Sequence, residues 1–356
     1  MKLTAINPLS GVGSWRRSCT FLAGRWLLIA LGLVAGGCWS ASPTELVVYT
    51  ALDREFSEPI FRDFEQATQI DVQSKFDVES TKTVGLVNAI IQEQNRPRCD
   101  VFWNNEILHT LRLEKLGLLE PFVLPQAEKF PDNYRSPQGN WYGFAARARV
   151  LLVNTDKLPE GERPTSVRDL ADPRWKGQGG LAYPLFGTTA THAAVLFAQW
   201  GENEAQDFFR KVKQNSEVLS GNKQVAIAVA RGQLAFGLTD TDDAIVELEK
   251  GMPVAIVYPD QGEGQMGTLF IPNTLCIIKG APHRAQAEQL LTYLLTPEVE
   301  QRLAAGPSAQ FPLHADVQQQ PRVHDDSVRW MDVDFSAAAD AWDTASEFLR
   351  NEFAEG

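Results

Sequence analysis

Short apolar runs alternate along the chain with longer stretches in which apolar residues recur every three or four positions. The first run, 47–50, is followed by Ile60, Phe64 and Ala67 at helical spacing. A buried strand needs only about four to eight apolar residues, whereas the wider spacing marks one face of a helix. The alternation continues with a strand at 71–76, a helix at 84–91, a strand at 100–103 and a helix at 108–116. This pattern predicts βαβ units that form a parallel sheet.

Two long extended stretches, 141–154 and 267–279, divide the rest of the chain. Helices are expected between them at 190–200, 222–231 and 242–251, and after them at 284–295, 297–304 and 338–353. A chain of this length exceeds one comfortable hydrophobic core. We therefore predict an α/β protein of two lobes joined by a two-strand hinge. Lobe one would comprise residues 45–146 plus 268–356, and lobe two residues 147–267.

The first 37 residues have the pattern of an export signal. A basic start precedes the apolar run Trp26–Val34, which is much shorter than the ~20 residues needed to cross a bilayer. Small residues then lead to Cys38, as in a bacterial lipobox, so we expect Cys38 to be lipidated and to anchor the protein in the cell envelope. Ordinary cleavage near Ala41 is the alternative. The pair Arg16-Arg17 leaves both the Sec and the twin-arginine route open.

The chain is acidic. It carries 45 Asp and Glu against 33 Lys and Arg, a net charge of −12, and loss of the four basic residues of the leader would make it more negative. This charge argues against nucleic acid as a partner and is compatible with a cationic ligand. Two cysteines, Cys99 and Cys276, follow the leader inside apolar strand patterns. We expect buried free thiols, although an oxidising compartment would permit a bridge.

Acidic and amide side chains follow the expected strands where a parallel sheet opens onto a crevice. Several carboxylates brought together there would repel one another by roughly 4 kcal/mol per pair at 4 Å and an effective dielectric near 20. Such a set favours a hard cation, such as ferric iron, Mn²⁺, Ca²⁺ or Mg²⁺, or an alkylammonium group. The expected metal ligands are Asp53, Glu106, Asp242 and Asp243, and the neighbouring ligand-binding residues are Asn105 and Asp240.

Each of these acids also has a purely structural interpretation. Asp242 and Asp243 begin an expected helix, where negative charge favours the helix dipole. Glu106 lies near the start of another helix, and Asp53 could form a surface pair with Arg54.

Small and hydroxylated residues precede the helix expected at 190–200. Gly187, Thr188 and Thr189 would present free backbone N–H groups at a helix start, which suits an anion. Arg147, at the beginning of the first extended stretch, could add a bidentate contact to that anion. The alternative is that a threonine only caps the helix. His192, one turn further on, is expected to be a packed histidine.

The runs 45–51 and 100–106, with the crossing strand around Arg147, resemble the ferric-ion-binding periplasmic proteins that serve ABC importers. That resemblance implies a bilobal, type II-like periplasmic-binding-protein fold, a monomer, and an inner-membrane permease as partner. It also implies that Glu106 is a metal ligand and that residues near Gly187 bind a phosphate or carbonate beside the metal. The family has a histidine at Asp53 and a tyrosine pair at Asp242 and Asp243, so this chain departs from the pattern at these positions.

The sequence is compatible with two ligand classes. In the first, the carboxylates bind a ferric-type cation and the helix start holds an anion. In the second, the carboxylates bind an ammonium group and the helix start holds the phosphonate of an aminoalkylphosphonate. The sequence contains no nucleophile elbow, His-Glu-x-x-His, Cys-x-x-Cys or P-loop motif, so no enzyme class is indicated.

Overall fold

The computed structural model describes residues 44–77 and 83–354. The predicted export signal at 1–37 and Cys38 lie outside these residues. Within the described part, no helix is both long and apolar enough to span a membrane.

Ten α-helices and ten β-strands occur in the described residues. The strands are β1 Thr44–Thr50, β2 Ile70–Phe76, β3 Val101–Asn104, β4 Leu119–Glu120, β5 Tyr142–Asn154, β6 Gly179–Ala182, β7 Ser216–Leu219, β8 Phe236–Asp240, β9 Val254–Val257 and β10 Phe270–Ile278. The helices are α1 Arg54–Thr68, α2 Val84–Gln92, α3 Leu108–Lys115, α4 Gly187–Trp200, α5 Glu202–Asn215, α6 Asn222–Ala230, α7 Thr241–Glu249, α8 Arg284–Leu294, α9 Pro297–Ala305 and α10 Phe335–Phe353.

The alternation of strand and helix that the sequence predicts is confirmed. In α1 the residues at helical spacing, Ile60 and Phe64, are buried, and β3 is buried along its whole length. The strand order is β2-β1-β3-β10-β5-β8-β6-β7, with β4 beside β10 and β9 beside β5. The pairs β1–β2, β1–β3, β6–β7 and β6–β8 are parallel, as expected of βαβ units.

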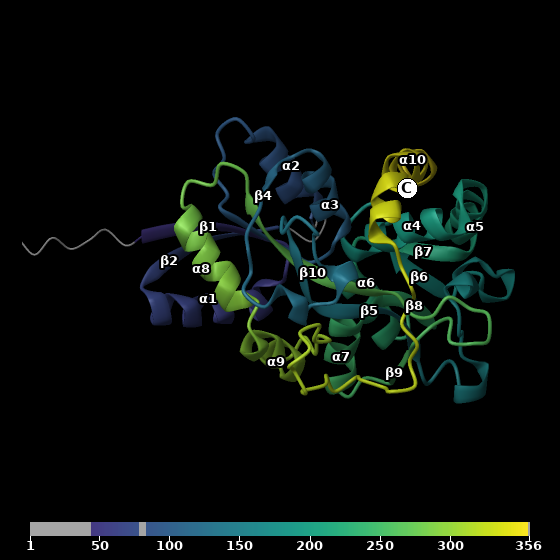
Figure 1. Ribbon diagram of the computed structural model, residues 1–356. Coiled ribbons are helices and arrows are strands. Elements are labelled where there is room, and N and C mark those ends of the chain that lie inside the picture. The colour runs from purple at the N-terminus through teal and green to yellow at the C-terminus, as the bar shows by residue number, and fades with distance from the viewer. Residues whose placement is uncertain (1–43, 78–82, 355–356) are drawn as a thin grey trace, which may run out of the picture. The chain divides into compact units, whose positions relative to one another are not determined.

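The two lobes meet along β5, which is buried over all 13 residues. Its first half pairs with β10 from Tyr142 to Ala148, and its second half pairs with β8 and β9 from Arg149 onward. One strand group therefore carries α1, α2, α3 and α8, and the other carries α4 to α7 (Figure 1). The bilobal α/β fold class is thus confirmed.

The crossing region contains a local irregularity. The register between β5 and β10 shifts between Ile271 and Asn273, and Ala145 adopts a positive φ of 44°. The buried carboxylate of Glu300 accepts the N–H of Ala145 at 2.6 Å. The side-chain amide of Asn273 donates to the carbonyl of Ala145. Such a bulge redirects a strand, and this one lies close to the place where the chain passes between the lobes.

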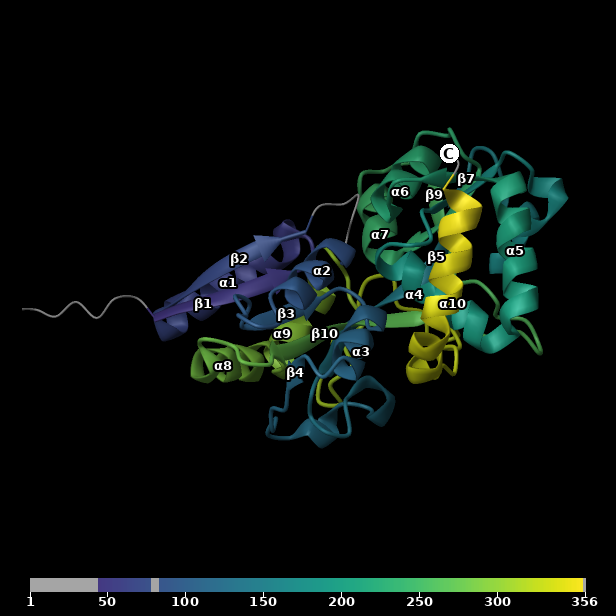
Figure 2. The ribbon, with the colours of Figure 1, turned by 90° about the horizontal axis from the view of Figure 1, so that it is seen from above.

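The last helix differs from the predicted domain division. Residues 268–356 were assigned to lobe one, yet α10 lies along α4 and α5 (Figure 2). Phe348 packs against Phe197, Phe353 against Phe209, and the Tyr183 hydroxyl donates to the Phe353 carbonyl. The amphipathic pattern of α10 predicts a helix with one apolar face but does not say which lobe that face covers. The remaining bounds of the lobes stay a prediction.

Cys99 and Cys276 are both buried and free, as predicted. Burial raises the pKa of each thiol, so neither is prone to form a thiolate.

Candidate functional site

The candidate site lies where the ends of β3 and β8 and the starts of α4 and α7 approach β5. β3 ends in Asn104, β8 ends in Asp240, and Thr241 opens α7 directly afterwards. Each of these strands changes abruptly from apolar to polar residues at its end, and the polar residues there are buried. Asn105, Glu106, Arg147, Thr188 and Asp240 are all at most 3 % exposed.

Arg149 and Asp240 form the centre of this site. Arg149 on β5 is fully buried and lies 2.7 Å from Asp240, its antiparallel partner on β8. The other oxygen of Asp240 accepts the Thr188 hydroxyl at 2.5 Å and the Asn222 amide at 3.0 Å. Burial alone would raise the pKa of Asp240, but the two arginines beside it outweigh burial and lower that pKa.

Arg147 contacts residues of both lobes. Its guanidinium lies 3.2 Å from Asp242 and 3.8 Å from Asp240, and it donates to the carbonyl of Asn105 at the end of β3. Burial alone would lower the pKa of Arg147, but Asp242 and Asp240 raise it. The structure thus directs this guanidinium at carboxylates, whereas the sequence predicted a contact to an anion.

Three carboxylates gather at the start of α7. Asp240, Asp242 and Asp243 each offer one oxygen, and these oxygens lie within 4.8 Å of one another. Against Arg147 and Arg149 they leave a net charge of −1. Among the described residues this is the one group of acidic, histidine or cysteine side chains spaced to hold a metal ion, and it includes neither Asp53 nor Glu106.

The start of α4 presents backbone donors next to the arginines. Gly187 has a φ of +54° and open space around its α-carbon, and the N–H groups of residues 187–189 have no acceptor among the described residues. The hydroxyls of Thr188 and Thr189 accept from Arg149 at 3.1 and 3.2 Å. The N-cap residue of α4 is Phe186, whose side chain has no hydrogen-bond acceptor, so no side chain caps this helix. The Nε atoms of Arg147 and Arg149 also lack partners in the described part of the chain.

Glu106 lies apart from the carboxylate cluster and is completely buried. Its oxygens accept the Asn104 amide at 2.8 Å, the backbone N–H of His109 at 3.1 Å and the Thr191 hydroxyl at 2.6 Å. The ring of His109 is also 3.0 Å away. Burial would raise the pKa of Glu106, but His109, Thr191 and Asn104 together lower it.

Asp53 precedes α1 and lies in a charged hollow of about 500 Å³ between the starts of α1 and α6. Glu55 and Lys223, 3.7 Å apart, face each other across that hollow. The predicted ligand set is therefore divided over three places: Asp53 in the hollow, Glu106 in its own network, and Asp242 with Asp243 at the start of α7.

Two residues of this site were not predicted. Arg149 was expected only as part of the hinge strand, and Asn222, the first residue of α6, was expected only to begin a helix. The spacing of Arg147 and Arg149 was a usable signal, because residues two apart in a strand share a face. No sequence signal marked Asn222, whose contacts arise only when α6 meets the end of β8.

Four of the six tyrosine hydroxyls form hydrogen bonds outside this site. The hydroxyl of Tyr49 donates to Glu93, and those of Tyr142, Tyr183 and Tyr258 donate to the backbone carbonyls of Phe122, Phe353 and Val323.

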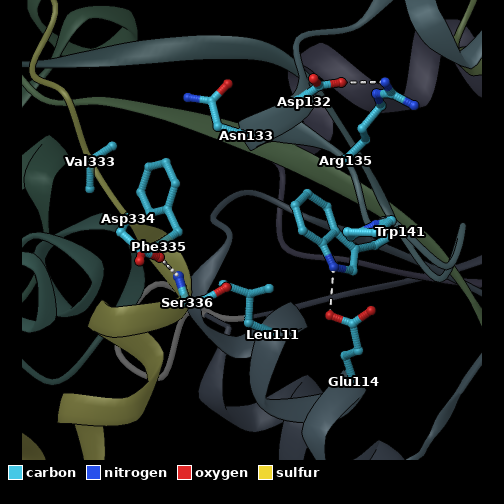
Figure 3. Close-up of a pocket in the computed structure, with 11 residues that line it drawn as sticks. Leu111, Glu114, Asp132, Asn133, Arg135, Trp141, Val333, Asp334, Phe335 and Ser336 are labelled. Carbon is cyan, nitrogen blue, oxygen red and sulfur yellow. Dashed lines mark hydrogen bonds and ion pairs between the residues drawn. The ribbon is translucent and has the colours of Figure 1, made fainter.

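A separate pocket of about 320 Å³ is lined by α3, the segment 132–141 and the start of α10 (Figure 3). Its acidic groups already have partners: Glu114 accepts the Trp141 indole N–H at 2.8 Å, and Asp334 caps α10. Asp132 pairs with Arg135. This pocket therefore offers a small ion few uncommitted ligands.

The two α/β lobes, the crossing strands and the buried polar site between them define a solute-binding protein. Residues 109–338 match the family model for bacterial extracellular solute-binding proteins, and the chain belongs to that family.

Among sequence relatives, the major ferric iron-binding protein of Neisseria meningitidis is 25 % identical over 298 residues, covering 81 % of this chain and 87 % of that protein. A putative 2-aminoethylphosphonate-binding periplasmic protein of Salmonella typhi is 24 % identical over 300 residues, covering 82 % and 85 %. The crystal structure of iron-bound HitA from Pseudomonas aeruginosa is similar in fold, with a TM-score of 0.77, 24 % identity, and coverage of 87 % of this chain and 99 % of that one.

Proposed function

We propose that this protein is the extracytoplasmic substrate-binding component of an ABC importer, that it closes its two lobes around a small ionic ligand, and that it delivers the ligand to an inner-membrane permease. It is not an enzyme in this proposal, and it acts as a monomer in the periplasm or cell envelope, held there through lipidated Cys38. The buried, charged site between two lobes supports this function, because hinge closure of this kind sequesters a ligand from water.

The leading ligand is a hard cation of the ferric type together with a small anion. The observation that carries this assignment is the cluster of Asp240, Asp242 and Asp243 at the start of α7. Both oxygens of Asp240 and both oxygens of Asp242 accept hydrogen bonds, so a cation that binds here would replace some of these donors. The anion would lie against the N–H groups of residues 187–189. The ferric iron-binding relative from Neisseria supports this ligand.

An aminoalkylphosphonate is the second candidate. The specific observation in its favour is that two buried arginines, Arg147 and Arg149, adjoin the donors at the start of α4, since a guanidinium near the carboxylates weakens their hold on a multivalent cation. A phosphonate would lie at the start of α4, and its ammonium would pair with Asp243. The phosphonate-binding relative from Salmonella supports this alternative.

Native mass spectrometry of protein purified without refolding distinguishes these ligands. One ferric ion with an anion gives one mass excess, and 2-aminoethylphosphonate gives another. If iron binds, the complex should be nearly colourless, because carboxylates lack the charge-transfer band of tyrosinate and the hydroxyls of Tyr49 and Tyr183 bond to other groups. An intense visible band on loading would contradict the carboxylate site.

Replacing Asp243 by Asn should weaken the binding of ferric citrate by about tenfold or more, because one of the carboxylates of the cluster loses its charge. Calorimetric titration of wild type and Asp243→Asn measures the difference. Asp207→Asn, which removes an exposed charge from α5, is the matched control and should bind as wild type does. Unchanged affinity in Asp243→Asn would exclude the start of α7 as the cation site.

A further inference from the structure

Both oxygens of Glu106 accept hydrogen bonds from donors of the protein itself. A carboxylate offers about four lone-pair positions, and Glu106 receives donors from Asn104, from the backbone and ring of His109, and from Thr191. Three of these donors come from its own lobe. The fourth, the Thr191 hydroxyl at 2.6 Å, belongs to α4 in the other lobe. A cation could reach Glu106 only by displacing one of these donors.

The bond between Glu106 and Thr191 crosses the boundary between the lobes in a dry environment. Both side chains are fully buried. A hydrogen bond to an ionised group is about twice as strong as one between neutral groups, and low solvent exposure strengthens it further. Thr191 lies in the same helix whose first turn contains the N–H groups of residues 187–189. Movement of that turn toward lobe one therefore also moves Thr191 toward Glu106.

The same network reaches α10. The ring of His109 packs edge-on against Trp342, with 5.9 Å between the ring centroids. Lys115 of α3 pairs with Asp340 of α10, and α10 itself lies along α4 and α5 (Figure 2). Both partners of the contact between Glu106 and Thr191 are therefore fixed by their neighbours. His109 bonds to Glu106 in lobe one, and α10 packs against α4, the helix of Thr191, in lobe two.

We infer that the hydrogen bond between Glu106 and Thr191 is an interlobe latch, and that Glu106 positions the closed state of the protein without coordinating the cargo. The inference rests on the proposed function only for the identity of the cargo. The latch makes closure favourable before any ligand binds, so a ligand needs less differential affinity to hold the lobes together.

Thr191→Val tests the latch, because valine keeps the shape of threonine and removes the hydroxyl. Small-angle scattering of the ligand-free protein should match the closed structure for wild type and for Thr191→Ser, which retains the hydroxyl. For Thr191→Val the ratio of closed to open molecules should fall by about ten- to a hundredfold, so the radius of gyration should rise. Thr292→Val is the control, because its hydroxyl bonds only to a carbonyl within α8. An unchanged radius of gyration in Thr191→Val would overturn the inference.

A second measurement separates a latch from a ligand. Dissociation of ferric citrate and of 2-aminoethylphosphonate is followed in wild type and Thr191→Val. A latch predicts dissociation at least about tenfold faster for the probe that binds. If Thr191→Val instead holds iron more tightly, then Thr191 competes with the metal for Glu106 and the inference is wrong. If neither probe binds, the proposed cargo is wrong, and the scattering result still decides the latch.

Discussion

Arg149→Met is expected to lower the free energy of unfolding by about 3–5 kcal/mol. Arg149 is fully buried, and its removal leaves the carboxylate of Asp240 in the interior without its closest positive charge, 2.7 Å away. Thr188, Asn222 and Arg147 would still face Asp240, but none replaces a guanidinium at that distance. Urea titration followed by circular dichroism measures the loss from the midpoint and slope of unfolding.

Two further variants show whether the loss comes from a stranded charge. Arg62→Met removes one side of an exposed pair with Glu58 and should cost less than about 1 kcal/mol. Adding Asp240→Asn to Arg149→Met should recover part of the stability, because the side chain that lost its closest positive charge is then neutral. If Arg149→Met is as mild as Arg62→Met, or if the double variant is less stable than Arg149→Met, the pair does not have the role assigned to it.

The fold was predictable from the sequence because its elements obey local rules. The hydrophobic pattern located β1, β3 and β5 and the apolar face of α1 to within a few residues. A strand buried on both faces gives a continuous apolar run, whereas a helix buried on one face gives apolar residues every three or four positions. The side on which α10 packs was not predictable, because an apolar stripe is equally suited to either lobe. The helix α5 was not named among the expected helices, although the apolar residues Phe208, Phe209 and Val212 on one face of a charged segment are a pattern that predicts a helix.

The candidate site was predictable as a set of positions but not as a set of partners. The sequence identified Asp240, Asp242 and Asp243, which do gather at one helix start. It also grouped Glu106 with them, because polar ends of parallel strands meet at one edge of a sheet. The choice of Thr191 as the partner of Glu106 depends on how the two lobes close, and no local pattern encodes that. The spacing of Arg149 from Arg147 could have placed it on the same face of the strand, but its partners on β8, α4 and α6 were not predictable from local sequence.

Stability should also fall as the solution becomes acidic because of His192. This side chain is 3 % exposed, and neither of its ring nitrogens has a partner among the described residues. Its surroundings are apolar, with Leu170, Leu181 and Phe208 among them. Burial, with help from Arg149 and against the opposing effect of Asp240, lowers the pKa of His192 to about 3.

The sign follows from the difference between the two states. An unfolded histidine has a pKa near 6.5, so between about pH 6.5 and pH 3 the unfolded chain binds a proton that folded His192 does not. Stability from His192 is therefore fully present above pH 6.5 and is lost as the pH falls, by up to about 1.4 kcal/mol per unit. Between pH 6 and pH 4 the loss amounts to about 2.5 kcal/mol.

His192→Leu should remove this dependence, because leucine suits the apolar surroundings and does not titrate. The stability advantage of His192→Leu over wild type should then be about 2.5 kcal/mol larger at pH 4 than at pH 6, measured by urea unfolding at both values. His192→Gln separates charge from polarity. It should lose the pH dependence as fully as His192→Leu does, but it should be less stable than His192→Leu at every pH, because its buried amide lacks partners. Other acids, such as Glu106, titrate in all three proteins and so cancel in the comparison. Parallel curves for wild type and His192→Leu would mean that folded His192 accepts a proton as readily as the unfolded chain, which a dry, unpartnered imidazole beside Arg149 does not do.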